Sequence, residues 1–416
     1  MSLFGFTRLR GYAAVALALG LSLGARTSAA QELDFSLGGK TSTPPIPIEL
    51  ASGKVHLKTR IGDWGAQWLL LDTGANMSIL NWEIATAKGL ELRGHGTTNS
   101  AAGGNTFEFA FTELPAVKVA NLEIAARTVA VIKRHTEAAN GHQSIGLIGA
   151  DVMKALVVEV DYPASTIRFH DPATFEYAGD GVSVPLTLDQ NSKPHIQALL
   201  TDPEGHSMTA DLVVDTGGRG FLVLSRPFVE EHHLEQRLEP PLLATTGVGI
   251  GGEVKHHLAR MQSLRVGGFE LLSPIVELPL QGTTGAYGRD DRSGVLEARF
   301  LERFRVFFDY PHERLILEPG PHFERPFEHD GSGTFLVAYD FHLDGVEVLR
   351  VAPDTPASEA GMQAGDQLIS IDGQSVVDLG LDGVRALFME FGRTLALVVQ
   401  RGSETLELEL SIRRLV

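Results

Sequence analysis

The chain has 416 residues, of which 43% are hydrophobic and 21% charged, and it carries a formal net charge of −17. This composition is typical of a soluble globular protein of roughly two to three domains, and its 45 glycines favour an all-β chain with many tight turns over a helical bundle. The charge argues against nucleic acid and anionic membrane surfaces as partners. The absence of cysteine excludes disulfides, lipid attachment at an N-terminal cysteine and thiolate chemistry.

Residues 1–30 have the pattern of a secretory signal peptide. Arg8 and Arg10 precede the apolar residues 12–23, and small residues end at Ala30, the expected cleavage point. A retained membrane anchor is the alternative, but a spanning helix needs about 20 apolar residues and this stretch is shorter. Removal of three arginines and no acid takes the formal charge to −20. We therefore expect an exported protein, periplasmic or secreted, without a stable membrane anchor.

Residues 31–45 are rich in Gly, Ser, Thr and Pro and are expected to form a flexible linker. From Ile46 onward, short segments with a two-residue hydrophobic period alternate with turns that contain glycine. In one of them the apolar residues 69–71 end at Asp72-Thr73-Gly74. This pattern predicts a buried strand with a carboxylate at its end, a position that is unfavourable unless another group compensates or uses the charge.

The same pattern returns at residues 212–217, where an apolar run ends at Asp215-Thr216-Gly217. The flanking segments repeat as well: residues 46–50 return at 184–188, and the sequence Asp-Tyr-Pro at 161–163 returns at 309–311. The offset grows from 138 to 143 to 148 residues along the unit, as expected when loops lengthen while strands keep their order. We predict two copies of one β unit, residues 46–175 and 176–325.

Two strand ends that each carry a carboxylate suggest that Asp72 and Asp215 meet. Each Asp-Thr-Gly could alone be an ordinary turn, but two copies that both follow apolar strands argue against this. Two carboxylates at hydrogen-bonding distance share one proton, because both cannot ionise cheaply. The ionised member can take a proton from water while the protonated member polarises a carbonyl. The predicted chemistry is amide hydrolysis without a metal or covalent intermediate.

This arrangement resembles the aspartic proteases of the pepsin and retropepsin fold, with both lobes in one chain. The resemblance implies an all-β fold of two homologous acid-protease β-barrel lobes, and an endopeptidase that acts without a cofactor on an extended protein or peptide substrate. Glycine in each turn would let the two turns approach closely, and the threonines would hydrogen-bond across the axis. The implied catalytic pair and its supporting residues are Asp72, Asp215, Thr73, Gly74, Thr216 and Gly217.

In that family an apolar-apolar-Gly element passes behind each Asp turn. Residues 147–149 match it in the first copy, but the second copy reads Val-Leu-Glu at 295–297, so Glu297 stands where the family has glycine. This departure could distort the second turn or add a third carboxylate. It favours the alternative function, a non-catalytic peptide-binding or chaperone-like envelope protein that keeps the protease fold.

A glycine-rich stretch follows each Asp turn, at residues 97–109 and 245–255. The spacing of glycines at 247, 249 and 252 also fits a dinucleotide-binding fingerprint, but that motif needs a strand before it and a helix after it, and an alternating strand follows here. We therefore predict two β-hairpins, which the resemblance makes flaps over the substrate. The expected flap glycines are Gly103, Gly104, Gly249, Gly251 and Gly252.

Residues 326–416 have a different pattern and are predicted to form a separate module, large enough to fold alone. The expected elements are a strand at 346–351, a short helix from Pro356 to Gly361, a helix at about 381–391, and strands at 395–401 and 406–412. This small α+β module resembles a PDZ domain of the bacterial envelope-protease type. The resemblance rests on residues 348–351, 356–361, 365–366 and 371–373.

PDZ domains bind an extended chain end by strand addition, with backbone N–H groups receiving the terminal carboxylate. The implied partner is a peptide ligand, with Gly333, Thr334 and Phe335 as the expected contacts. A packing module that binds nothing is the alternative. No metal or cofactor is predicted, because the adjacent histidines at 232–233 and 256–257 point to different sides of their elements.

Overall fold

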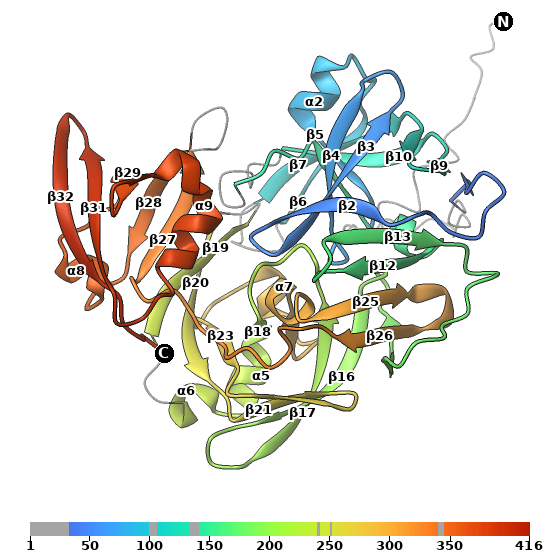
Figure 1. Ribbon diagram of the computed structural model, residues 1–416. Helices are drawn as coiled ribbons and strands as arrows, with labels where there is room; N and C mark the ends of the chain where they lie inside the picture. Colours follow the sequence, from blue (N-terminus) through green and yellow to red (C-terminus); the bar gives the residue numbers. More distant parts are fainter. Residues whose placement is uncertain (1–32, 100–105, 134–140, 239–241, 250–251, 340–344) are drawn as a thin grey trace, which may run out of the picture.

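The computed structural model describes residues 33–99, 106–133, 141–238, 242–249, 252–339 and 345–416. Figure 1 shows three bodies along the chain: a first lobe in blue and cyan, a second in green to brown, and a C-terminal module in red. The expected signal peptide, residues 1–30, lies outside the described residues. Among the residues that are described, no helix has the length and hydrophobicity needed to cross a membrane.

The first lobe consists almost entirely of short strands. They are β2 (Ile46–Ala51), β3 (Lys54–Ile61), β4 (Ala66–Leu71), β5 (Ile79–Asn81), β6 (Arg93–Asn99), β7 (Thr106–Leu114), β8 (Val117–Val119), β9 (Leu122–Ile124), β10 (Arg127–Ile132), β11 (Gly146–Ile148), β12 (Val157–Asp161) and β13 (Thr166–His170), with helices α2 (Trp82–Ala87) and α4 (Ala150–Met153). Buried and exposed side chains alternate in β8 and β9, as in strands with one buried face.

The second lobe repeats this order of elements. Its strands are β14 (Val182–Pro185), β15 (Thr187–Leu188), β16 (Pro194–Thr201), β17 (Ser207–Val214), β18 (Leu222–Leu224), β19 (Leu242–Gly249), β20 (Gly252–Arg260), β21 (Ser263–Val266), β22 (Phe269–Leu272), β23 (Ile275–Pro279), β24 (Gly294–Leu296), β25 (Phe304–Asp309) and β26 (Arg314–Pro319). Its helices are α5 (Arg226–Glu231), α6 (Leu234–Arg237), η1 (Gly285–Gly288), α7 (Ala298–Leu301) and η2 (Tyr310–His312). The predicted mostly-β fold is confirmed.

One sheet joins the two lobes. Strands β12 and β25, which each lead into an Asp-Tyr-Pro sequence, pair antiparallel with Val160 opposite Val306. This pair continues into β26 and β14 on one side and into β13 and β2 on the other. Backbone hydrogen bonds between the lobes therefore fix their relative position, and Figure 1 shows these strands between the two bodies.

The segment before Ile46 differs from the expected flexible linker. Its strand β1 (Phe35–Ser36) pairs with β9, and Leu37 is buried in the core. The Thr43 hydroxyl accepts a hydrogen bond from the Phe169 N–H at 3.1 Å. Turn-forming residues dominate this stretch, but Leu37 buries apolar area and Thr43 supplies a partner for a buried amide, so the segment packs on the lobe.

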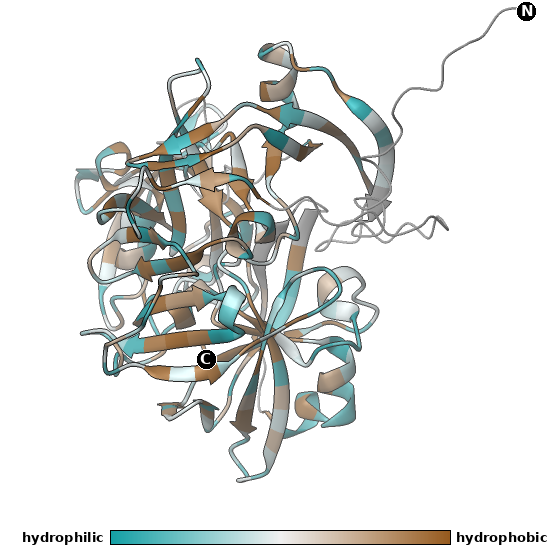
Figure 2. Ribbon diagram, turned by 90° about the vertical axis from the view of Figure 1, so that its right-hand side faces the viewer, coloured by the Kyte–Doolittle hydropathy of each residue, from teal (hydrophilic) through white to brown (hydrophobic). Residues whose placement is uncertain are grey.

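The described residues form two large hydrophobic cores and a small cluster of Phe109, Phe111, Ala130 and Ile132 in the first lobe. One runs through both lobes and includes Leu71, Val214 and the strands of the joining sheet. The other lies wholly within the C-terminal module, with Val348, Leu368 and Val384 among its members. Figure 2 shows the hydrophobic stretches along the strands and hydrophilic residues in many of the peripheral loops.

The C-terminal module is a twisted sheet covered by one long helix. Its strands are β27 (Thr334–Tyr339), β28 (Gly345–Val351), β29 (Gln367–Ile371), β30 (Gln374–Ser375), β31 (Thr394–Arg401) and β32 (Glu404–Ser411), and its helices are α8 (Pro356–Glu359) and α9 (Val376–Leu387). In sheet order β27 lies at one edge and β32 at the other. Asp372 and Gly373 both have positive φ, as a tight hairpin turn requires.

Helix α9 begins earlier than predicted. The prediction placed it from about residue 381, but the structure starts it at Val376 after the N-cap Ser375 and ends it at Leu387. Gly380, with φ 64° and ψ 174°, interrupts the helix with a kink. The helix predicted from about residue 381 is therefore the part that follows this glycine break.

Candidate active site

Asp72 follows directly on the last residue of the buried strand β4. Strand β11 runs parallel to β4, with Ile148 opposite Leu71, and the Asp72 N–H donates to the Ile148 carbonyl at 2.9 Å. Leu71 is fully buried. Strand β4 leads into the turn and β11 hydrogen-bonds to the backbone of its first residue, as the sequence motif predicts.

Asp215 has the same surroundings in the second lobe. Strand β24 runs parallel to β17, with Leu296 opposite Val214, and the Asp215 N–H donates to the Leu296 carbonyl at 2.8 Å. The Asp215 Oδ1 accepts a hydrogen bond from the Gly217 N–H at 2.7 Å. The backbone of the second turn therefore keeps the arrangement of the first, although Glu297 replaces the expected glycine.

The two turns bind one another through their threonines. The Thr73 N–H donates to the Thr216 Oγ1 and the Thr216 N–H donates to the Thr73 Oγ1, both at 3.0 Å. Each hydroxyl then donates to a carbonyl of the opposite lobe at 2.7 Å, Thr73 to Val214 and Thr216 to Leu71. Both threonines are fully buried. These four hydrogen bonds form a threonine grip that joins the two strand ends to one another.

The grip places each carboxyl group against the glycine of the opposite turn. A Cβ added at Gly217 would lie 2.5 Å from Cγ of Asp72, and one added at Gly74 would lie 2.6 Å from Cγ of Asp215. Any larger residue would collide with the acid. The structure thus brings together all six residues expected at the catalytic pair, and the glycines are there because each one faces the other lobe's carboxyl group.

Glu297 fits behind the second turn because glycines stand at the positions of the turn that face its side chain. In lobe 1 the backing residue is Gly149, and a Cβ there would lie 2.4 Å from the backbone of Met77. In lobe 2 the turn itself carries the glycines: a Cβ at Gly218 would lie 2.1 Å from Cδ of Glu297, and one at Gly220 would lie 2.8 Å from its Oε2. In lobe 1 the glycine is behind the turn, and in lobe 2 the glycines are within the turn. The space they leave holds the Glu297 side chain, so Glu297 does not distort the turn.

The β-hairpins expected to be flaps have formed, although their tips are only partly described. Strands β6 and β7 pair in lobe 1, and β19 and β20 pair in lobe 2 with Gly249 opposite Gly252. Gly103, Gly104 and Gly251 lie outside the described residues. A strand, and not a helix, follows the glycines of lobe 2, which is incompatible with the dinucleotide fingerprint.

Two lysines near the acids were missed by the sequence reasoning. The β2–β3 turn of lobe 1 places Lys54 in the electrostatic field of Glu297, and the matching turn of lobe 2 places Lys193 near Asp215 and Asp72. Burial lowers the pKa of Lys193, and nearby Arg292 lowers it further, while the acids oppose both. The signal was in the sequence: Lys54 and Lys193 occupy equivalent places, one before a Val-His-Leu and the other before a Pro-His-Ile.

Of the three expected peptide contacts in the C-terminal module, Phe335 lies against the second lobe. Gly333 has φ +81°, and its N–H donates to the Asp330 carboxylate at 3.0 Å. Thr334 and Phe335 begin β27. Phe335 is buried, with the Arg219 guanidinium 4.6 Å from the centre of its ring. Arg219 is half-buried, and burial lowers its pKa to about 9.

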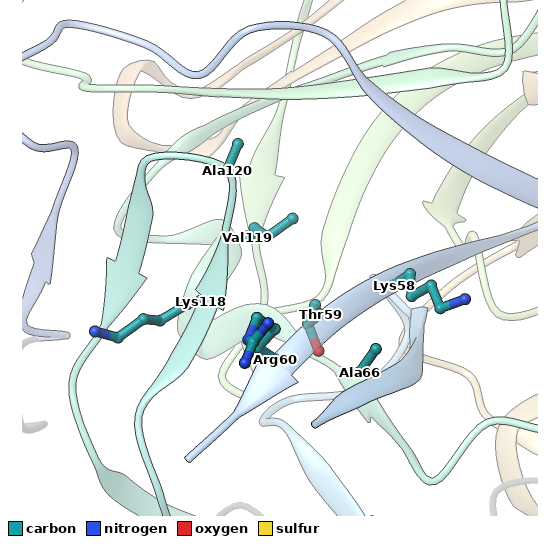
Figure 3. Close-up of a pocket in the computed structure, with 7 residues that line it drawn as sticks. All are labelled: Lys58, Thr59, Arg60, Ala66, Lys118, Val119 and Ala120. Atoms are coloured by element: carbon teal, nitrogen blue, oxygen red, sulfur yellow. The ribbon is translucent and has the colours of Figure 1, made fainter. Parts of the chain in front are cut away.

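The adjacent histidines at 256–257 lie near different acids. His256 Nδ1 lies 2.9 Å from Glu277, while His257 Nδ1 lies 3.6 Å from Glu235. The first lobe has a pocket of about 160 Å³, and Figure 3 shows the residues that line it. Its lining residues are Lys58, Thr59, Arg60, Ala66, Lys118, Val119 and Ala120. None of them belongs to an Asp-Thr-Gly turn, so this pocket is separate from the paired acids.

Two family models match the chain. Residues 57–152 match the model described as aspartyl protease, and residues 347–401 match the PDZ domain model. The chain therefore contains an aspartyl protease domain followed by a C-terminal PDZ domain, as the sequence motifs indicate. The first match includes Asp72 and Gly149 and ends before the second lobe, so Asp215 lies outside it.

The relatives of known sequence match only short parts of the chain. Serine protease HTRA1 of Xenopus tropicalis is 39% identical over 70 residues, 17% of this chain and 15% of that protein. A probable CtpA-like serine protease of Staphylococcus haemolyticus (strain JCSC1435) is 34% identical over 94 residues, 22% of this chain and 18% of that protein. The chain thus spans less than a fifth of the length of either relative.

Two solved structures show partial similarity. The Basic 7S globulin from soybean aligns over 69% of this chain and 97% of its own, with 12% identity and a TM-score of 0.39. The photosystem II D1 C-terminal processing protease aligns over 21% of this chain and 23% of its own, with 27% identity and a TM-score of 0.19.

Proposed function

We propose that this chain, with its aspartyl protease and PDZ domains, is an exported aspartic endopeptidase that hydrolyses peptide bonds of protein substrates. Asp72 and Asp215 form the catalytic pair and share one proton. The ionised carboxylate removes a proton from water, and the protonated one polarises the scissile carbonyl. No metal or covalent intermediate is needed.

The reciprocal threonine grip is the observation that carries the proposal. A turn that only reversed the chain would not need hydroxyls buried in the opposite lobe, since most buried polar groups find partners nearby. Here Thr73 and Thr216 hold two strand ends together, and each end presents an acid against the other's glycine. Such a rigid pair supports acid–base catalysis, because the two carboxyl groups are held before the substrate arrives.

A serine-type mechanism, which the names of the two relatives raise, has weaker support. Ser144 Oγ lies 2.8 Å from His56 Nδ1 and 3.4 Å from His142 Nδ1, and His142 Nε2 lies 3.1 Å from Glu49. Ser144 is only 5% exposed, however, so its hydroxyl is not reachable by a peptide bond. The aspartic assignment is favoured because the paired acids are held by dedicated contacts.

The PDZ module is proposed to regulate access to the substrate site while docked. The Ser52 N–H and hydroxyl donate to Asp382 of α9 at 2.6 and 3.2 Å. Arg385 donates to the Ser52 hydroxyl at 2.6 Å and to the Leu336 carbonyl of β27 at 2.9 Å. A Cβ at Gly141 of the first lobe would lie 3.3 Å from Leu381 of α9. The first lobe therefore contacts α9, and Arg219 of the second lobe contacts Phe335 of β27. Strand addition would bring a peptide to this same β27–α9 side.

The test compares the parent with Asp72→Asn and Asp215→Asn on a denatured protein substrate from acid to neutral pH, with and without an active-site-directed aspartic protease inhibitor. Asparagine keeps the shape and the hydrogen-bond acceptor of aspartate, so we expect both variants to fold and to lose hydrolysis. Asp63→Asn, an exposed turn acid, serves as the matched control and should cleave like the parent.

Activity at the parental level in either active-site variant would refute the proposal. A parent that binds the denatured chain without cutting it at any pH would instead support the non-catalytic peptide-binding alternative. Cleavage that the inhibitor leaves intact, together with loss of activity in Ser144→Ala, would favour the serine-type assignment.

A further inference from the structure

The second lobe contains a buried acid that the proposed chemistry does not use. Glu297 is 4% exposed and lies behind the turn that carries Asp215. Its Oε2 accepts a hydrogen bond from the Gly220 N–H at 2.6 Å, and its Oε1 accepts one from the Tyr287 hydroxyl at 3.3 Å. Two hydrogen bonds hold the Glu297 carboxyl group, and two glycines make room for it. These contacts indicate that Glu297 has a structural or functional role at this turn.

A second acid faces the same point. A Cβ added at Gly220 would lie 2.6 Å from Oε1 of Glu277 and 2.8 Å from Oε2 of Glu297, so these oxygens are no farther apart than the sum of the two distances. Glu277 also lies 2.9 Å from Nδ1 of the buried His256. The four side chains form a continuous polar row, in the order Tyr287, Glu297, Glu277 and His256.

The charges around Glu297 come from both lobes. Burial raises the pKa of Glu297 to about 8, and the negative charges of Glu277 and Asp215 act in the same direction. The Gly220 hydrogen bond and the cation of Lys54 from lobe 1 partly oppose this. The row itself contains three titratable groups besides Glu297: His256 on β20, Glu277 on β23 and Tyr287 on η1. The titratable and charged groups that face the row are Asp215 after β17, Arg219 in the turn, Lys54 on β3 and His329 before β27.

We propose that Glu297 is a positioning residue for Asp215, which holds the turn at Gly218–Gly220 while it is uncharged and releases that turn when it ionises beside Glu277. The inference rests on the proposed function, because it assigns Glu297 to the support of the second catalytic acid. In the uncharged state the two oxygens accept from the Gly220 N–H and from the Tyr287 hydroxyl. Ionisation buries a second negative charge beside Glu277, and the repulsion between the two carboxylates acts against these bonds and favours separation of the two side chains.

The sign of the pH effect follows from this arrangement. Glu297 binds its proton more tightly in the folded chain than in the unfolded chain, where the ordinary pKa is 4.5. Stability supplied by the uncharged acid is therefore complete below pH 4.5 and is lost as pH rises toward about 8. The site should be intact in acid and should weaken as the pH becomes alkaline.

The experiment uses the full chain with Glu297→Gln, since glutamine keeps a carbonyl acceptor for Gly220 and cannot ionise. We expect the denaturation midpoint of the parent to fall between pH 4.5 and 8, and the fall to be smaller in the variant. In the parent the Gly220 amide NMR shift should titrate over the same range, and in Glu297→Gln this titration should disappear. The pH at which hydrolysis is lost should be about one unit higher in Glu297→Gln than in the parent.

Glu324→Gln, an exposed acid of the second lobe, is the control and should show the parental pH dependence throughout. Equal pH profiles of stability and of the Gly220 shift in Glu297→Gln and the parent would overturn the inference, even if the enzyme is active. A parent without hydrolase activity would overturn the proposed function, whereas the stability and NMR measurements would still decide whether Glu297 controls the turn.

Discussion

Replacement of Thr216 by valine would measure what the threonine grip contributes. Valine has nearly the same shape but lacks the hydroxyl, so Thr73 N–H and the Leu71 carbonyl would both lose their bonds to Thr216 Oγ1. Each buried group left without a partner costs about 1–3 kcal/mol, which gives roughly 2–6 kcal/mol in total. This is a large share of the roughly 5–15 kcal/mol by which a domain is stable.

Urea denaturation followed by circular dichroism would measure the loss, with peptide hydrolysis measured in parallel. Thr216→Ser is the matched control: it keeps the hydroxyl and removes one methyl group, so it should lose only about 1 kcal/mol. We expect the valine variant to lose turnover as well, because the strand end that carries Asp215 is no longer held to lobe 1. A valine variant as stable and active as the serine variant would refute the role we assign to the grip.

Two further substitutions test the turn behind Asp215 and the docking of the PDZ module. Gly218→Ala should lower the free energy of unfolding by a few kcal/mol, because its Cβ would lie 2.1 Å from Cδ of Glu297. In thermal denaturation the double variant Gly218→Ala/Glu297→Gly should recover most of that loss. Additive losses of stability in the double variant would contradict the compensation of Glu297 by Gly218. Asp382→Ala removes the acceptor of both Ser52 hydrogen bonds and should raise kcat/KM on a denatured protein substrate. Asp378→Ala, which changes an exposed acid on the same helix, is the control and should leave kcat/KM at the parental value. Equal kcat/KM in Asp382→Ala and the parent would argue against regulation by docking.

Much of this site could be predicted because its information is local. An apolar strand that ends in Asp-Thr-Gly is visible in seven residues, and its repetition at a separation of 143 residues indicates the partner. The parallel elements at 146–148 and 294–296 follow from the same repeat. Local patterning also indicated strands β28, β31 and β32 of the PDZ module, because turns with Gly, Pro or Asp bound them.

The missing part of the prediction depended on contacts between distant residues. The sequence indicated that Glu297 could distort the second turn, because the glycine that makes room for its side chain and donates a hydrogen bond to it is Gly220, 77 positions away. No local pattern shows that a glycine in a turn faces a side chain on another strand. The repeat relates Lys54 to Lys193, but it does not show which acids their turns place them near.

The pairing of β12 with β25 gives the chain the form of a dimer whose two subunits have been fused. Like elements meet across the joint, as they would in a symmetric pair of identical half-chains. In such a pair every substitution would occur on both sides at once, so an acid behind one turn would require the same acid behind the other. Fusion removes that restriction: Gly149 can back the first turn while Glu297 backs the second. The covalent link therefore permits two unequal acids within one nearly symmetric frame.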